Sequence, residues 1–309
     1  MTDDDVEGRK LVKNLNSISI ASSSPSFPID KVFVLDAGYG FPREKKVRKE
    51  KINAIALQLS NFLTWQMHQQ ETYHYSTASI KLVGCPDENI KILLENRTLE
   101  NIKKETSSTN LLPPHVTVSC ETLEQCLENL TKQQQQQRRD LYEDDDSAGE
   151  NDVSDKANDG ASTSHNTSSI ASTKPVYLSP DADESLDPSG EPPTIAIIGL
   201  LVDRRVKPNR SRDRANNLGV IARRWPLEDC FKDIDACEPL NIDVILEGMQ
   251  QWWWNSSCTN FEKSTNNLNG TKEAFVQAAS QAIHHHAERH PSRPLHITKT
   301  TIDTNKPTN

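Results

Sequence analysis

The stretch that decides the fold is TIAIIGLLVDRRVKPNRSRDRANNLGVIARRWPL, residues 194–227. It opens with an apolar run that stops at Asp203. Eight Lys/Arg and a single acid, Asp213, then occupy residues 204–224. A short apolar run bounded by charge is typical of a buried strand in a parallel sheet. Ligands of such sheets bind beyond the carboxyl ends of the strands, which is where Asp203 falls.

On both sides of this strand the chain alternates between strand-like and helix-like patterns. Apolar runs bounded by turn residues predict the strands, and apolar residues at helical spacing predict the helices. The predicted strands are 32–37, 79–84, 115–119, 175–182, 194–202 and a strand edge at 220–224. The predicted helices are 43–68, 88–103, 121–130, 211–218, 240–254 and 272–289. This order predicts an α/β fold with a parallel sheet.

The alternation indicates one interrupted domain. We expect a disordered polar lead (1–30), a domain over 31–258 with a disordered acidic insertion at 132–173, and a C-terminal helix and tail (259–309). The insertion cannot bury enough apolar surface to offset its ordering entropy. It is either a solvated segment or an acidic competitor for the chain's own basic RNA-binding face.

Composition narrows the class of protein. The net charge is −9, and the six cysteines have no Cys-x-x-Cys spacing. The sequence has no signal peptide, clear transit peptide or apolar run of membrane-spanning length. We therefore expect a reduced, soluble protein of the nucleus or cytoplasm, without a membrane partner.

Asp203 and the basic run after it have two interpretations each. The carboxylate caps a turn, or it does chemistry beside a phosphate-binding rim of guanidinium groups. The basic run is a solvated face, or it binds nucleic acid. Gly199, inside a bulky strand, suggests that a ligand or a second backbone approaches closely. These residues alone predict an α/β domain that binds RNA.

Residues 175–254 add a resemblance to a known family. YLSPDA, IIGLLVD, RANNLGVIARRWPL and PLNIDVILEGMQQWW occur there in this order. Together they resemble the SPOUT-superfamily tRNA methyltransferases that methylate N1 of the purine at tRNA position 9. The resemblance implies a sheet with a C-terminal trefoil knot that holds S-adenosyl-L-methionine, no metal, and a monomer that binds tRNA. The implied activity is methylation of N1 of guanine at position 9.

The resemblance also implies roles for individual residues. Asp203 matches the family's catalytic carboxylate. The implied cofactor-binding residues are Leu178, Gly199, Arg204, Arg205, Val206, Lys207, Ser211, Trp225, Glu238, Pro239 and Leu240. The residues that we expect to bind RNA are Lys45, Lys46, Arg48, Lys49, Lys51, Arg210, Arg212, Arg214, Arg223 and Arg224.

The implied chemistry explains the lone acid in its basic surroundings. Guanine N1 carries a proton at neutral pH and must lose it as the methyl group arrives. A carboxylate within hydrogen-bonding reach can accept that proton or orient the N–H group. Arg204 and Arg205 would keep Asp203 ionised, and they would equally stabilise an N1 anion.

Three residues depart from the family pattern. Leu200 stands where a second glycine is frequent, Ser211 where cysteine is frequent, and Trp225 at a usual leucine, where it would crowd the adenine pocket or stack in it. Two alternatives therefore stay open. One is a non-catalytic tRNA-binding homologue in an RNA-processing assembly, and the other is a SPOUT methyltransferase with another RNA target or adenine specificity.

Two further motifs lie near the C-terminus. His286 and His290 are one helical turn apart and form a possible metal pair, but no third ligand is evident nearby, so a solvated helix is favoured. The tryptophans at 252–254 cannot share one helix face. At least one should be exposed, where it could stack on a base, or should pack on the tail.

Overall fold

In a computed structural model the described residues are 31–106, 111–143, 174–201, 208–227, 231–232, 240–262, 269–290 and 298–299. Residues 144–173 and 202–207 lie outside them. Within these ranges the strand–helix alternation expected from the sequence is confirmed.

The centre of the fold is a six-stranded sheet whose strands are all parallel, in the order β3-β2-β1-β5-β4-β6. The strands are β1 (Val32–Asp36), β2 (Ser79–Val83), β3 (Val116–Val118), β4 (Val176–Leu178), β5 (Ile195–Gly199) and β6 (Ile221–Arg223). A separate antiparallel pair joins β7 (Phe231–Lys232) to β8 (Thr298–Lys299). The sequence did not predict this pair.

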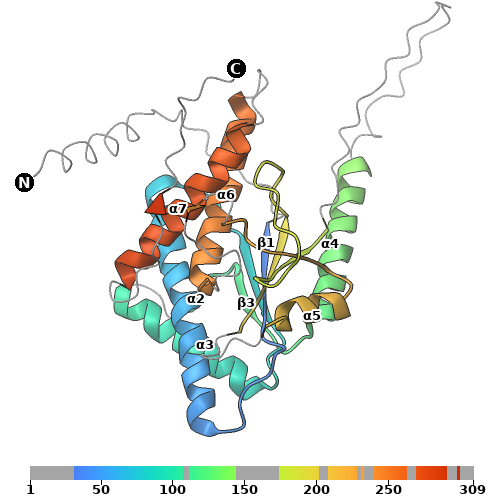
Figure 1. Cartoon of the computed structure of the whole chain (residues 1–309). Coiled ribbons are helices and arrows are strands. Elements are labelled where there is room, and N and C mark those ends of the chain that lie inside the picture. The colour runs from blue at the N-terminus through green and yellow to red at the C-terminus, as the bar shows by residue number, and fades with distance from the viewer. Residues whose placement is uncertain are drawn as a thin grey trace, which may run out of the picture.

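Helices cover both faces of the sheet (Figure 1). One face carries α2 (Lys45–Tyr73), α3 (Glu88–Glu105), α6 (Ile242–Glu262) and α7 (Asn269–Arg289). The other carries α4 (Leu123–Glu143) and α5 (Arg210–Asn217). Side chains alternate along a strand, so the central strands contribute to two cores. In β1, for example, Phe33 lies in the core under α2 and α6, and Val34 in the core under α4 and α5.

Helix α4 corrects one predicted boundary. We expected the insertion to begin at residue 132, but α4 continues to Glu143. The extra residues are mainly Gln, Arg, Leu and Glu, which all have good helix propensity. Their lack of apolar surface made them look disordered, although a helix anchored at its first turns by Leu123 and Leu130 can extend into solvent.

The three consecutive tryptophans of α6 are all buried, at 0, 1 and 4% exposure. Trp252 contacts Phe275 of α7, Trp253 contacts Phe33 of the sheet, and Trp254 stacks on Trp65 of α2. Helix α6 is therefore enclosed on three sides. Packing of one tryptophan on the C-terminal helix was expected, and this buried arrangement gives no support to base stacking.

Candidate functional site at the carboxyl edge of the sheet

The candidate site lies where β1 and β5 end side by side. From β1 the chain enters α2 on one face of the sheet, and from β5 it leads to α5 on the opposite face. The segments that follow these two strands therefore diverge. Such a switch in chain direction is where open parallel sheets bind ligands.

A buried carboxylate, Asp36 at the end of β1, organises this edge. It is fully buried, and its Oδ1 accepts the backbone N–H of Gly38 at 2.8 Å. Its Oδ2 accepts the hydroxyl of Tyr177 and Nε–H of Arg214, both at 3.0 Å. Asp36 thus joins the end of β1 to β4 and α5. Burial without such partners would strongly disfavour the charge.

Two tyrosines continue the network toward the surface. The hydroxyls of Tyr39 and Tyr177 are 2.6 Å apart, and the guanidinium of Arg210 lies 5.3 Å from the centre of the Tyr39 ring. Burial, the largest cause, raises the pKa of Tyr39 to about 12 and also raises the pKa of Tyr177. Both side chains are therefore neutral hydroxyls near pH 7. They can donate hydrogen bonds here, but they cannot serve as general bases.

Sequence reasoning missed Asp36, Tyr39 and Tyr177 as site residues. The signal was available, because DAGY follows an apolar strand in the same way that Asp203 does. What the sequence could not supply was the adjacency of β1 and β5, which brings two such strand ends together.

Three of the expected cofactor-binding residues lie at this edge. Leu178 and Gly199 end neighbouring strands, and Leu178 pairs with Ile198 in register. The buried hydroxyl of Ser211, in the first turn of α5, lies 2.7 Å from that of Ser179. The sheet and α5 therefore bring together residues that are far apart in the sequence.

Close neighbours within the chain account for a glycine at position 199. A Cβ at this position would lie 2.8 Å from Cε2 of Tyr39 and 3.0 Å from the hydroxyl of Tyr177. Two tyrosine side chains thus approach this glycine closely, and a side chain at position 199 would overlap them.

Trp225 and Leu240 lie toward α6 and α7. The Trp225 ring is 8% exposed, lies 5.0 Å from the Phe275 ring, and sits against Gly248, where a Cβ would be 3.0 Å from its Cζ2. Leu240 is half-buried against the same core. The Trp225 side chain is therefore part of the hydrophobic core, which accounts for a bulky residue at a usual leucine.

The predicted catalytic residue and the other predicted cofactor-binding residues lie outside the described residues. They are Asp203, Arg204, Arg205, Val206, Lys207, Glu238 and Pro239. For Asp203 to Lys207, the described chain stops at Leu201 and resumes at Pro208.

The arginines expected to bind RNA mostly contact an acidic loop formed by Asp181, Ala182, Asp183 and Glu184. Arg212 pairs with Asp183 at 3.0 Å, and Arg223 with Glu184 at 2.8 Å. Arg224 donates to the carbonyls of Ala182 and Asp183. The carboxylates of these pairs are exposed, so the pairs contribute little stability and phosphate could replace them.

Two of the expected RNA contacts are corrected by the structure. Arg214 is committed to Asp36 and lies 3.7 Å from Glu124. Lys51 is 7% exposed and donates to the carbonyl of Gly40 at 3.0 Å. Arg214 donates to the buried carboxylate at the end of β1, and Lys51 donates to a backbone carbonyl of the loop that follows β1, so both cations have partners within the chain.

The remaining cations of α2 face solvent. Lys45, Lys46 and Lys49 are exposed and Arg48 is half-buried. Lys45, Arg48 and Lys49 line a cavity of about 380 Å³ between α2 and α3, together with Arg97. Asp87 is the one acidic residue of the lining, so the cavity has an excess of positive charge, which suits the phosphates of a nucleic acid.

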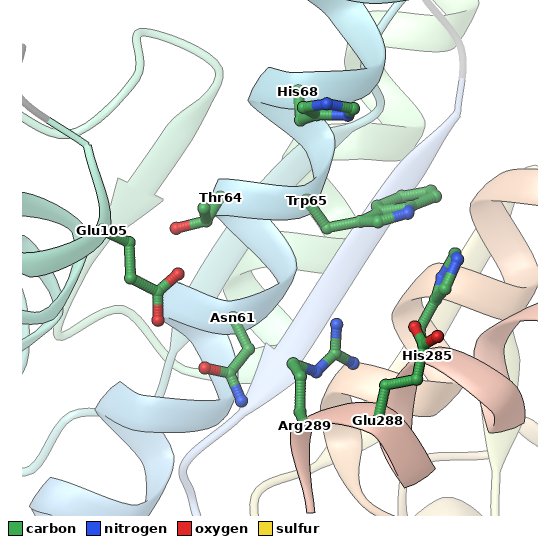
Figure 2. A pocket seen from close by; sticks show the side chains of 8 residues that line it. All are labelled: Asn61, Thr64, Trp65, His68, Glu105, His285, Glu288 and Arg289. Atoms are coloured by element: carbon green, nitrogen blue, oxygen red, sulfur yellow. The ribbon is translucent and has the colours of Figure 1, made fainter.

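A second group of polar residues lies away from the sheet edge, where α7 meets α2 and α6. A cavity of about 400 Å³ is lined there by Asn61, Thr64, Trp65, His68, Glu105, His285, Glu288 and Arg289. Figure 2 shows the His285, Glu288 and Arg289 side chains facing those of α2 across it. Beside it two fully buried carboxylates, Asp243 and Glu247, contact Arg289. Desolvation, the largest cause, raises the pKa of Glu247.

Comparisons with known proteins find likeness only among solved structures. No model of a protein family and no curated protein matches the chain. A full-length spTrm10–SAH complex is 15% identical, with 81% of this chain and 96% of that one covered and a TM-score of 0.43. The structure of spTrm10(74) is 14% identical, with 81% and 95% covered and a TM-score of 0.44. A dual-specific Trm10 from Thermococcus kodakaraensis is 13% identical, with 80% and 99% covered and a TM-score of 0.41. Trm10 proteins are tRNA methyltransferases of the SPOUT family.

Among the described helices, none is long and apolar enough to cross a membrane.

Proposed function

We propose that the chain is an S-adenosyl-L-methionine-dependent tRNA methyltransferase that methylates N1 of guanine at position 9. The observation that carries the proposal is the convergence of β4, β5 and α5 at one edge of a parallel sheet. The SPOUT-like motifs end at this edge: YLSPDA follows β4, and IIGLLVD runs through β5 toward Asp203. We also propose that the chain between β5 and α6 forms the trefoil knot implied by these motifs.

The donor set at this edge fits S-adenosyl-L-methionine. The hydroxyls of Ser179, Ser211 and Tyr39 can bond ribose or amino-acid groups, while Leu178 offers an apolar contact. When bound, the cofactor supplies an electrophilic methyl group on a sulfonium centre. Leu178, Gly199, Ser211, Trp225, Leu240 and the residues 204–207, 238 and 239 would hold it.

We assign to Asp203 the handling of the proton on guanine N1. Its carboxylate accepts or orients the hydrogen on guanine N1 as the new bond forms. Arg204 and Arg205 stabilise negative charge on N1, and Arg210 and Arg212 hold neighbouring phosphates. Arg212 and Arg223 exchange their exposed acidic partners for the RNA backbone, and Arg224 exchanges its carbonyl partners for it. The lysines of α2 bind tRNA at a second position, and the enzyme acts as a monomer.

One observation favours a second candidate function, a non-catalytic tRNA-binding protein. Tyr39 and Tyr177 fill the space beside Gly199, and the Trp225 ring is committed to the core. If these side chains also hold their positions in the presence of cofactor, the pocket is closed and the basic surface alone remains functional.

Equilibrium binding of S-adenosyl-L-homocysteine by isothermal titration calorimetry separates the two functions. The methyltransferase proposal expects micromolar binding, weakened at least tenfold by Ser211→Leu, which places a larger apolar side chain beside Ser179. Tyr73→Ala, an exposed residue of α2 far along the chain from the edge, serves as the control. A wild-type protein that binds tRNA but does not bind the cofactor would exclude the methyltransferase function and support the second candidate.

A further inference from the structure

The third ligand that the sequence lacked for His286 and His290 is Asp243. One ligand atom from each of these three residues lies within 4.8 Å of the others. His286 lies in the last turn of α7, His290 directly follows that helix, and Asp243 lies in the first turn of α6. Their imidazole rings have centroids 4.6 Å apart. Three donors from two helices therefore converge on one point.

The chemistry of these donors favours a divalent transition metal. Two imidazoles with one carboxylate suit zinc, iron, cobalt or nickel better than magnesium or calcium, which prefer oxygen ligands alone. Two ligands of a tetrahedral zinc ion lie about 3.4 Å apart, given bond lengths near 2.1 Å. The three atoms thus need to approach by roughly 1 Å, which rotation of the histidine side chains can supply.

Neighbouring polar groups hold the Asp243 carboxylate in place. Its Oδ1 accepts the N–H of Val244 at 3.1 Å, and its Oδ2 accepts the amide N–H of Asn61 at 3.2 Å. Carboxylates that bind metals typically have such supporting hydrogen bonds, because these fix the orientation of the ligand. The side-chain NH₂ of Asn241 lies 3.3 Å from Nε2 and 3.5 Å from Nδ1 of His286, so it must turn away from the nitrogen that binds the metal.

Charge at the junction also favours a cation. Asp243 and Glu247 are both fully buried. Arg289 lies 2.5 Å from Glu247 but 3.5 Å from Asp243, so its guanidinium mainly compensates Glu247. A buried carboxylate without full compensation is costly, and a divalent ion beside Asp243 would remove that cost.

We propose that Asp243, His286 and His290 bind one divalent transition-metal ion of the zinc class, which fastens α7 to α6. Solvent completes the coordination, since the three residues leave at least one position open. The site lies between α6 and the end of α7, away from the carboxyl edge of the sheet, and is independent of the methyltransferase proposal.

Cobalt and zinc titrations of the full chain test the site. The protein is stripped with EDTA, and Co²⁺ binding is followed by visible absorption of the bound ion. His290→Gln is the main variant because this half-buried residue at the end of α7 can be changed without opening the core. His284→Gln, an exposed histidine of the same helix, is the matched control. Far-ultraviolet circular dichroism verifies that each variant is folded.

The proposal expects one Co²⁺ per chain and displacement by Zn²⁺. It expects at least tenfold weaker binding in His290→Gln and Asp243→Asn, and unchanged binding in His284→Gln. Zinc at a hundredfold excess over its Kd should raise the Tm of wild type by roughly 5–10 °C. Lack of micromolar binding by wild type would overturn the proposal, and so would a His290→Gln protein that binds as wild type does.

Discussion

Replacing Asp36 by asparagine removes the charge that joins β1, β4 and α5 while keeping the shape of the side chain. The carboxylate accepts three hydrogen bonds, from Gly38, Tyr177 and Arg214. An amide presents one oxygen and one NH₂ group, so at least one donor must face another donor. Arg214 also loses its buried partner, although its own side chain is 27% exposed and can recover some hydration.

The expected loss follows from these contacts. A charge-assisted hydrogen bond contributes about 1.5–3 kcal/mol, and breaking a fully buried ion pair costs about 3–5 kcal/mol. Partial hydration of Arg214 favours the lower part of this range. We therefore expect Asp36→Asn to reduce the free energy of unfolding by about 2–4 kcal/mol.

Urea unfolding followed by tryptophan fluorescence measures this loss. Glu124→Gln is the matched control, because Glu124 is about half exposed and lies 3.7 Å from the same arginine. It should cost less than about 0.5 kcal/mol. The account of this edge is refuted if Asp36→Asn costs less than about 1 kcal/mol, or no more than the control.

Three more predictions concern single residues. Gly199→Ala should lower the free energy of unfolding by about 1–3 kcal/mol, since its Cβ would overlap the Tyr39 ring. In urea unfolding, the same substitution should lower it by less when Tyr39 is also replaced by alanine. Equal losses in the wild-type and the Tyr39→Ala proteins would contradict this prediction. Burial lowers the pKa of His115, so the unfolded chain binds more protons and the free energy of unfolding should fall as pH drops below about 6.5. His115→Gln should flatten that dependence in urea midpoints measured from pH 5 to 8, and an unchanged slope would exclude the assignment. Lys49→Gln should reduce the slope of log K for tRNA binding against log salt concentration by about one ion. Lys51→Gln should lower the Tm and leave that slope unchanged, because Lys51 is buried. The reverse pattern would contradict the assignment of Lys49 to the RNA surface and of Lys51 to the interior.

The strand–helix order followed directly from the sequence because apolar runs and helical spacing are local signals. Asp203 was noticed for the same reason, since a charge that directly follows an apolar strand needs no tertiary knowledge. Gly199 was noticed too, but its contact with Tyr39 could not be predicted, because Tyr39 lies far away in the chain and reaches it only through the pairing of β1 with β5.

The contacts of the other site residues could not be predicted, because their partners lie far away in the sequence. Lys51 and Arg214 carry the same charge as true surface cations, and only the fold shows that Lys51 is buried against the carbonyl of Gly40 and that Arg214 is paired with the buried Asp36. Asp243 could not be linked to His286 from spacing alone, because the packing of α7 on α6 brings them together.

The central claim, methylation of guanine N1 with Asp203 handling the proton, is tested most directly by transfer of labelled methyl groups. Wild type and Asp203→Asn are assayed with S-adenosyl-L-methionine and unmodified tRNA carrying guanine or adenine at position 9. We predict guanine-dependent transfer that falls at least a hundredfold in the variant. Transfer to adenine, transfer insensitive to the substitution, or no transfer by a wild-type protein that binds tRNA would contradict the account.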